Sequence, residues 1–238
     1  SFNSKITSKL FIKTGIISEV IRLVLDARAK DSLSKWNQYW DFKDNTMLHQ
    51  AYVQAKYRFT DKLTLNAGVH AQFLALNNSN SVEPRIGLKY QLAEKHTISA
   101  GYGMHSQMQP TDVYFYRTHN ADGTYELTNK DLGFTNSQHF VIGYDVLPLK
   151  DWRIKTEMYY QMLSNVPVTK TPGSYSMLNA GASFLANDQA NLKNSGTGKN
   201  YGTELTIEKF FSKNYYVLLT GTLYESKYKG SDKLERNT

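Results

Sequence analysis

Hydrophobic and polar residues alternate over long stretches of this chain, most regularly in residues 63–77. Successive side chains of a β-strand point to opposite faces of the sheet, so this alternation predicts a strand with one apolar and one polar face. The apolar series is Leu63, Leu65, Ala67, Val69, Ala71, Phe73 and Ala75, and the other series is Thr64, Asn66, Gly68, His70 and Gln72.

The period of two recurs along most of the chain and predicts about nine antiparallel strands. Most of them exceed the ~5–6 residues usual in soluble sheets and reach the ~9–11 residues that cross a bilayer at a tilt. The clearest strands are 47–59, 63–77, 86–92 and 152–162, and less regular ones are 10–25, 97–109, 137–147, 200–211 and 215–228.

The connections between these strands alternate between short and long. Short polar turns cover 60–62, 93–96, 149–151 and 212–214, and longer polar links cover 26–46, 78–82, 110–136 and 166–199. Short turns at one rim and long loops at the other are typical of outer-membrane β-barrels, whose long loops face the outside. A soluble β-sandwich has shorter strands and less regular connections. The predicted fold class is therefore all-β, an antiparallel transmembrane β-barrel wall that contacts the lipid of the bacterial outer membrane.

Aromatic residues gather near the predicted short turns. Amphipathic rings favour the membrane–water interface, so this clustering indicates an aromatic girdle at that rim. General enrichment of aromatic residues in strands is the alternative, and the alternating loop lengths favour the girdle. The residues concerned are Tyr57, Phe59, Tyr90, Tyr144, Trp152, Phe210, Phe211, Tyr215 and Tyr216.

Composition agrees with an alternating chain and excludes several classes of protein. The mean hydropathy is −0.51 although the chain contains 17 Tyr, 11 Phe and 3 Trp. The absence of cysteine excludes disulfides and thiolate sites. The net charge is +7, but the 28 Lys and Arg are interspersed with 21 Asp and Glu, so no nucleic-acid partner is expected. The first residues lack the apolar core of a signal peptide, so a targeting sequence is expected outside this chain.

The chain contains no catalytic or cofactor-binding pattern. Gly196-Thr197-Gly198-Lys199 fails the phosphate-loop spacing, because Lys193 and Asn200 occupy the positions that require Gly and Ser or Thr. The six histidines form no H-x-x-x-H pair. We therefore expect no enzymatic activity, no metal site and no cofactor.

Charged and polar residues that alternate with apolar ones are predicted to face the lumen of the barrel. For His70, His105 and His139, hydrogen bonding to the plug or to lumenal water is favoured over metal ligation. The predicted lumen-facing residues are Lys56, Arg58, His70, Gln72, Arg85, Lys89, Glu157 and Glu204.

The long links are the predicted place of ligand recognition, because variable loops on a rigid scaffold carry specificity. Asp122-Gly123 lies between two strand-like runs of link 110–136 and predicts a hairpin there. The ligand-binding candidates are Tyr114, Tyr116 and Arg117 in this link and Tyr175 in link 166–199. Aromatic rings and a guanidinium can stack on a ligand. The alternative is that these residues pack the loops together.

Several short motifs carry a family resemblance. Glu83-Pro84-Arg85-Ile86-Gly87 resembles the "EPR-x-G" strand start of TonB-dependent outer-membrane receptors. Residues 194–205 are similar to the "N-x-G-x-x-x-x-Y-G-x-E-L" segment of the same family. Residues 101–110 and 129–134 resemble the subgroup that carries a carboxypeptidase-regulatory-like domain ahead of the plug. The order of the motifs extends the resemblance over nearly the whole chain.

The resemblance implies a roughly 22-stranded barrel that holds an N-terminal plug and imports a nutrient ligand with energy delivered by TonB. About nine strands cannot close such a barrel, and an open sheet edge is not stable in lipid. We therefore expect residues 1–238 to be a partial barrel domain, with its own plug, the TonB-contacting segment and the closing strands outside this chain. The alternatives are a passive porin, a surface receptor or adhesin barrel, and a soluble all-β binding domain.

Overall fold

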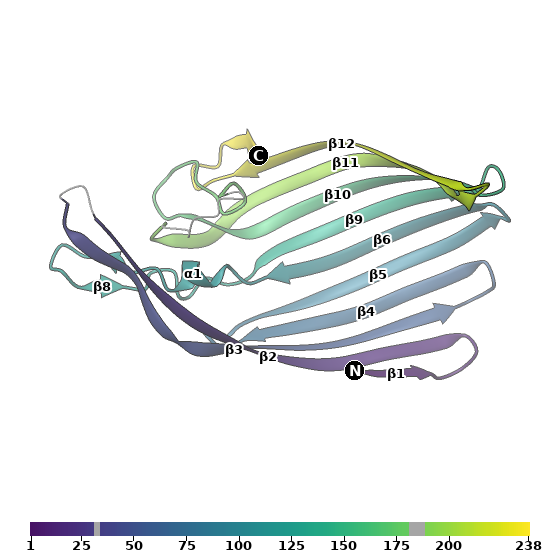
Figure 1. The fold of residues 1–238 in the computed structure, drawn as a ribbon. Helices are drawn as coiled ribbons and strands as arrows, with labels where there is room; N and C mark the ends of the chain where they lie inside the picture. The colour runs from purple at the N-terminus through teal and green to yellow at the C-terminus, as the bar shows by residue number, and fades with distance from the viewer. Residues whose placement is uncertain (31–33, 181–188) are drawn as a thin grey trace.

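The computed structural model describes residues 1–30, 34–180 and 189–238, which form one large antiparallel sheet of eleven strands (Figure 1). The strands lie in chain order, with β1 at one edge and β13 at the other, which confirms the predicted all-β antiparallel class. They are β1 (Phe2–Lys5), β2 (Leu10–Lys30), β3 (Trp36–Arg58), β4 (Leu63–Leu74), β5 (Ser79–Ala93), β6 (His96–Gln107), β9 (Thr135–Val146), β10 (Trp152–Thr169), β11 (Leu192–Ser212), β12 (Tyr215–Lys229) and β13 (Glu235–Asn237). Among the described residues, no helix is long and apolar enough to span a membrane.

The connections between strands differ between the two ends of the sheet. Figure 1 shows short turns at the right-hand end and the longer loops at the left-hand end. The β11–β12 turn consists of Lys213 and Asn214, whose φ values of 52° and 66° are both positive, as a type I′ hairpin turn requires. Long links are found as predicted between β6 and β9 and between β10 and β11, whereas only four residues join β4 to β5.

The prediction of a loop over 26–46 is wrong. Strand β2 continues to Lys30 and β3 begins at Trp36, and these two residues pair with one another. Polar residues such as Asp26, Arg28 and Gln38 interrupt the alternation in this hairpin. Where a hairpin extends beyond the lipid, water can reach both of its faces, so the apolar–polar period that marks a membrane strand is lost there.

Other predicted boundaries also move toward longer strands. Strand β10 reaches Thr169 and β11 begins at Leu192, so both enter the predicted link 166–199, and β5 begins at Ser79 inside the predicted link 78–82. The short edge strands β1 and β13 were not predicted, because three or four residues carry too little periodicity.

The link between β6 and β9 is a folded loop that contains one helical turn and a small hairpin. These elements are α1 (Thr111–Tyr114), β7 (Thr118–His119) and β8 (Tyr125–Glu126). The hairpin predicted from Asp122-Gly123 is confirmed, since β7 pairs with β8 and Gly123 has a positive φ of 85°.

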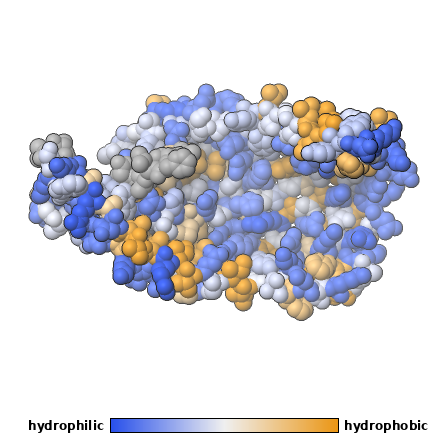
Figure 2. Space-filling model, viewed as in Figure 1, coloured by the Kyte–Doolittle hydropathy of each residue, from blue (hydrophilic) through white to orange (hydrophobic). Residues whose placement is uncertain are grey.

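The two faces of the sheet differ in chemistry. One cross-strand row on the apolar face consists of Tyr57, Leu65, Leu88, Ala100, Ile142, Met158, Thr203 and Leu223. Ile142 and Leu223 are 67% and 77% exposed, which indicates a lipid-facing surface in a chain of this kind. The sheet is curled, with its middle strands farthest from the viewer in Figure 1, and Figure 2 shows that the centre of this hollow side is mainly hydrophilic.

The buried apolar core lies at the loop end of the sheet, where the β6–β9 loop folds onto β3 and β4. Its members are Trp40, Leu48, Leu74, Val113, Tyr114, Phe115, Tyr116, Leu132, Phe134 and Leu192. We call this group the loop core.

Candidate functional site

The polar face carries all eight residues that the sequence predicts to face the lumen. Strand pairing puts Arg58, Thr64, Lys89, Ser99, Gly143, Glu157, Glu204 and Thr222 in one row across the sheet. Lys56, His70, Gln72 and Arg85 lie on the same face, at even spacing from that row along β3, β4 and β5. Contact of these residues with a transported solute stays a prediction.

Charge is unevenly distributed along this face. On β9, β10 and β11, Arg153 forms an ion pair with Asp145 and lies 3.5 Å from Glu208, and Lys155 pairs with Glu157. On β3 and β5, Lys56, Arg58 and Lys89 have no carboxylate within ion-pair distance among the described residues. The polar face therefore has a basic half and a half in which acidic residues are largely paired.

Glu83 on β5 is the centre of the most connected polar group on this face. Its side chain is only 1% exposed. The carboxylate accepts a hydrogen bond from the Gln72 amide, an ion pair of 2.7 Å from Arg85 and a 3.0 Å contact from His70 Nδ1. It also accepts the backbone N–H of Ser106 on β6 at 3.0 Å.

These contacts satisfy the Glu83 carboxylate, which would otherwise be costly to bury. His70 extends the group to β3, since its Nε2 lies 3.1 Å from Oε1 of Gln50. The Glu83 group therefore ties β3, β4, β5 and β6 together on the polar side. Three predicted lumen-facing residues, His70, Gln72 and Arg85, meet at a carboxylate that sequence reasoning did not single out.

A hollow of about 370 Å³ lies on the polar face beside the Glu83 group. Tyr52, His70 and Arg85 line it, together with backbone at Gly68 and Gly87. A Cβ at Gly68 would come within 2.7 Å of the Val53 carbonyl oxygen, so this position requires glycine for close strand approach. The hollow therefore exposes the phenol ring of Tyr52, the imidazole of His70 and the guanidinium of Arg85 to the polar side of the sheet.

The loop core holds two of the four predicted ligand-binding residues. Tyr114 is fully buried, and its hydroxyl accepts the backbone N–H of Gln109 at 3.0 Å. Burial raises the pKa of Tyr114 to about 12, so its phenol stays neutral at alkaline pH values at which an exposed tyrosine ionises. Tyr116 stacks on Tyr39 with ring centroids 5.7 Å apart and meets Trp40 edge-on.

Arg117 lies at the base of the β7–β8 hairpin. Its guanidinium binds the Asp41 carboxylate at 3.0 Å and lies 4.0 Å from the centroid of the Tyr125 ring. Tyr175 packs beside the loop core, and its hydroxyl donates to Sδ of Met177. These contacts agree with the alternative interpretation that the four residues pack the loops together, and a role in ligand binding stays a prediction.

The β6–β9 loop is fixed to the extended end of β3 by backbone contacts. The indole N–H of Trp40 donates to the Asp112 carbonyl at 2.8 Å, and the Arg117 N–H donates to the Tyr39 carbonyl at 2.9 Å. Leu48 and Leu74 pair across β3 and β4 on the same side as the Glu83 group. The loop therefore packs against the polar, hollow side of the sheet near its loop end.

A family model described as "TonB dependent receptor-like, beta-barrel" matches residues 21–237. The chain belongs to this family. As a TonB-dependent receptor barrel segment it is a protein of the bacterial outer membrane. A sequence comparison with curated proteins gave no match.

Solved outer-membrane transporters share the fold. The FrpB iron transporter from Neisseria meningitidis (F3-3 variant) has a TM-score of 0.63 and 14% identity, over 98% of this chain and 36% of that protein. YddB from Escherichia coli has a TM-score of 0.63 and 13% identity, over 99% of this chain and 34% of that protein. The siderophore receptor PirA from Pseudomonas aeruginosa has a TM-score of 0.55 and 12% identity, over 93% of this chain and 46% of that protein. The chain spans less than half of each of these proteins.

Glu83 lies at the centre of the polar group of this TonB-dependent receptor barrel, and sequence reasoning did not name it as a candidate. A signal was present, because Glu83 alternates with Ser81 and Arg85 on the polar face of β5. The cross-strand pairing of Glu83 with His70 is set by the register between β4 and β5, which the alternation alone does not define.

Metal binding by side chains of the TonB-dependent receptor barrel has no support from the geometry. Within residues 1–30, 34–180 and 189–238, no group of three or more His, Asp and Glu side chains is placed to hold an ion. His70, one of the three histidines considered for metal ligation, contacts Glu83 and Gln50.

Proposed function

We propose that this chain is part of a TonB-dependent transporter that actively imports an extracellular nutrient, with the polar face lining the path. Membership of the TonB-dependent receptor family supports outer-membrane transport. The Glu83 group, the basic residues of β3 and β5 and the hollow beside them give the path a polar, structured wall.

The position of the β6–β9 loop favours a gated transporter over a passive porin. The loop packs against the hollow side of the sheet through Trp40 and the β3 backbone, so in a closed barrel it would narrow the entrance at the loop end. A loop that is fixed by a buried apolar core can also hold specific side chains toward an arriving ligand. This is the observation that carries the proposal.

Active import requires partners beyond residues 1–238. The family implies a plug domain inside the barrel and TonB as the source of energy. We propose that both act with this wall, and that the wall is completed by further strands. The structural neighbours include an iron transporter, a copper transporter and a siderophore receptor, so the shared fold is compatible with several cargoes.

Within the loops, we propose that Arg117 and Tyr175 contact the ligand and that Tyr114 and Tyr116 hold the loop in place. Arg117 and Tyr175 are partly exposed, whereas Tyr114 and Tyr116 are buried. Under this division, Arg117→Gln raises the ligand concentration needed for half-maximal uptake without lowering the amount of folded receptor. Equal uptake curves for the variant and the natural protein would argue against the contact.

The test of active import compares strains that carry or lack the full-length gene. Accumulation of radiolabelled ferric chelates, copper and oligosaccharides is measured in both strains, and the solute that depends on the gene is then followed in a strain without TonB. Active import predicts that accumulation falls to the level of the gene deletion. Accumulation that needs the gene but not TonB would show a passive porin instead. Surface binding without accumulation would show a receptor or adhesin.

A further inference from the structure

The apolar, lipid-facing side of the sheet contains a pocket near the loop end of β10, β11, β12 and β13. Its volume is about 310 Å³, and its lining includes Tyr160, Met162, Lys199, Lys227, Lys229 and Glu235. Strand register places Met162, Lys199 and Lys227 side by side, and pairs Lys229 with Glu235. We call this site the outer lysine pocket.

The outer lysine pocket lies on the same face as the exposed apolar row. Met162 follows Met158 by four residues along β10, and Lys227 follows Leu223 by four residues along β12. At ~3.3 Å per residue, Lys199 and Lys227 lie about 13 Å from that row toward the long loops, and Lys229 lies about 20 Å from it. The side facing the lipid therefore changes from apolar to basic at the boundary on the loop side, where the headgroups of the outer leaflet lie.

The charges in the pocket leave one cation in excess. Nζ of Lys199, Lys227 and Lys229 lie 2.9, 3.8 and 3.9 Å from the nearest carboxylate oxygen of Glu235. Lys227 also contacts Glu225 at 2.6 Å. Among the described residues, three ammonium groups therefore share two carboxylates, and the Lys229 side chain is 46% exposed.

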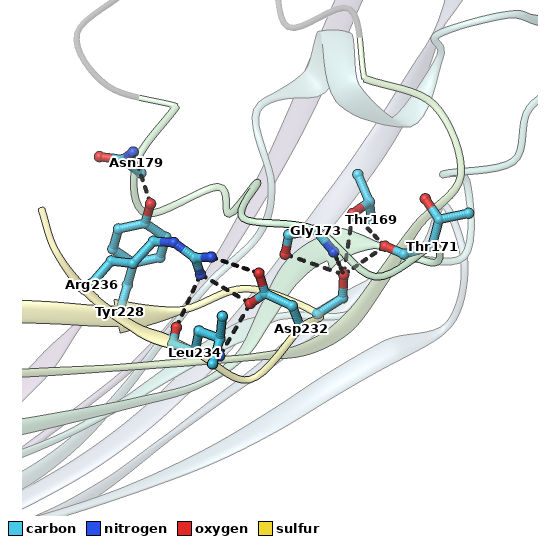
Figure 3. A network of polar contacts seen from close by, with 9 residues as sticks. Thr169, Thr171, Gly173, Asn179, Tyr228, Asp232, Leu234 and Arg236 are labelled. Atoms are coloured by element: carbon cyan, nitrogen blue, oxygen red, sulfur yellow. Dashed lines mark hydrogen bonds and ion pairs between the residues drawn. The ribbon is translucent and has the colours of Figure 1, made fainter.

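Glu235 is fixed in this position by contacts on the other side of β13, which Figure 3 shows from close by. The guanidinium of the next residue, Arg236, binds both oxygens of Asp232, at 2.9 and 2.6 Å. Ser231 donates to the Thr171 carbonyl at 2.6 Å and accepts the Gly173 N–H at 3.0 Å. The β12–β13 connection is therefore tied to the β10–β11 loop, which fixes the place of β13 beside β12.

We propose that the outer lysine pocket binds the phosphate-bearing headgroup of an outer-leaflet lipid, whose acyl chains lie along the apolar face below. Phosphate oxygens accept charge-assisted hydrogen bonds from lysine, and the excess cation matches an anion. A lipid can contact both the lysines and the apolar border of the site, since Tyr160 and Met162 are exposed beside the lysines. A soluble anion would use only the lysines and would leave this apolar border in water.

The site is separate from the proposed path of import, because it opens on the lipid side of the sheet. Loss of lipid binding and loss of TonB-dependent uptake are therefore distinguishable. A receptor that fails to import any tested solute can still bind the lipid, and a variant without the pocket can still import.

The experiment uses the full-length receptor, purified in non-ionic detergent and titrated with a diphosphorylated glucosamine-disaccharide lipid. The same lipid after chemical removal of both phosphates is the matched ligand control. The pocket variant is Lys199→Gln/Lys227→Gln/Lys229→Gln, and the protein control is Lys95→Gln/Lys150→Gln/Lys213→Gln. The control makes the same change of charge at exposed lysines of the short turns, at the other end of the sheet.

We expect the natural receptor and the control to bind the phosphorylated lipid about tenfold more tightly than the dephosphorylated one. The pocket variant loses this difference, and added NaCl weakens binding to the natural receptor because it screens the charges. Equal binding of both lipids, or an unchanged preference in the pocket variant, overturns the proposal. Full competition by millimolar inorganic phosphate also overturns it, because a free anion would then be the ligand.

Folding of each variant is checked by its heat-dependent gel mobility before binding is measured. If the triple variant does not fold, Lys229→Gln alone is tested, since this side chain is the most exposed of the three lysines. The single variant is expected to lose part of the preference for the phosphorylated lipid. A folded Lys229→Gln receptor with an undiminished preference contradicts the proposal.

Discussion

The two halves of strand β3 carry their apolar side chains on opposite faces of the sheet. In its membrane half, Val53 and Tyr57 point to the lipid side, where Val53 is 49% exposed. In its loop half, Leu48 and Trp40 point to the opposite side and are 7% and 9% exposed. The apolar residues thus move from odd to even positions within one continuous strand.

This change of parity reflects a change of solvent. In lipid, apolar side chains are stable on the outside, and the interior face is polar. Beyond the lipid, water surrounds the wall, so apolar side chains are buried inward against a folded loop as in a soluble protein. The loop core is therefore a small soluble-type core built on the end of a membrane wall.

The largest effect is expected from a cavity in the loop core. Leu74→Ala removes a fully buried side chain and should destabilise the loop core by about 2–5 kcal/mol. Hydrogen exchange of the full-length receptor should then show faster exchange in residues 108–134, while the membrane strands stay protected. Leu223→Ala, on the exposed apolar face, is the matched control. Equal acceleration of residues 108–134 in both variants would contradict a separate loop core.

A charge on the lipid side should have the next largest effect. Val69→Lys puts an ammonium group on the apolar face midway along β4 and should cost about 2–4 kcal/mol in a folding titration into lipid vesicles. Asn66→Lys is the matched control, because Asn66 lies on the polar face beside the hollow. Gln72 is less suitable, since its amide binds Glu83 and the Ser106 carbonyl. Equal penalties at positions 66 and 69 would mean that the two faces are assigned wrongly.

The same contrast explains which parts of the fold are predictable from sequence. Where lipid lies on one side, as in residues 63–74, alternation is regular and predicts the strand and its faces. Beyond the lipid, the apolar residues Leu48, Phe42 and Trp40 occupy even positions, whereas Val53 occupies an odd one. Polar residues also surround them in the sequence, so the pattern predicts a loop instead of a strand. Their burial depends on the β6–β9 loop, which is 72 residues away in sequence at the Trp40–Asp112 contact.

The candidate site shows a similar division. Alternation along β4 and β5 places His70, Gln72 and Arg85 on the polar face. That they converge on Glu83 depends on register and on the Ser106 N–H of a neighbouring strand, which no local pattern carries. The sequence gives no reason to prefer Tyr114 or Arg117 as a ligand-binding residue. In the structure the Tyr114 ring is buried, whereas the Arg117 guanidinium is partly exposed.

Removal of the charge at Glu83 should have a smaller effect. Glu83→Gln keeps the shape of the side chain but leaves Arg85 and His70 facing an amide, which should cost about 1.5–3 kcal/mol. The measurement is denaturant unfolding of the receptor in detergent, with exchange of the Ser106 N–H as a local probe. Glu157→Gln is the control, because Glu157 is more exposed and contacts only Lys155 among the hydrogen bonds described. A larger loss at Glu157 than at Glu83 would contradict the central role of the Glu83 group.

The smallest effect at neutral pH is expected from Tyr114→Phe, which costs about 1 kcal/mol because the Gln109 N–H loses its acceptor. Its pH dependence is more informative. Burial raises the pKa of Tyr114 to about 12, whereas an exposed tyrosine ionises near 10. The folded loop therefore keeps a proton that the unfolded loop releases, so the stability of the loop core is complete below pH 10 and falls as the pH rises toward 12.

Hydrogen exchange in residues 108–134 across pH 9–12, corrected for the intrinsic rate at each pH, should show this loss in the natural receptor and a weaker one in Tyr114→Phe. Tyr125→Phe changes an exposed tyrosine of the same loop and serves as the control. If Tyr114→Phe retains the full pH dependence while Tyr125→Phe loses it, the buried phenol is not the group that responds. The stability of the loop core at high pH would then depend on the hairpin that carries Tyr125, whose ring lies against Arg117. The exposed hairpin would in that case belong to the same stability unit as the buried loop core.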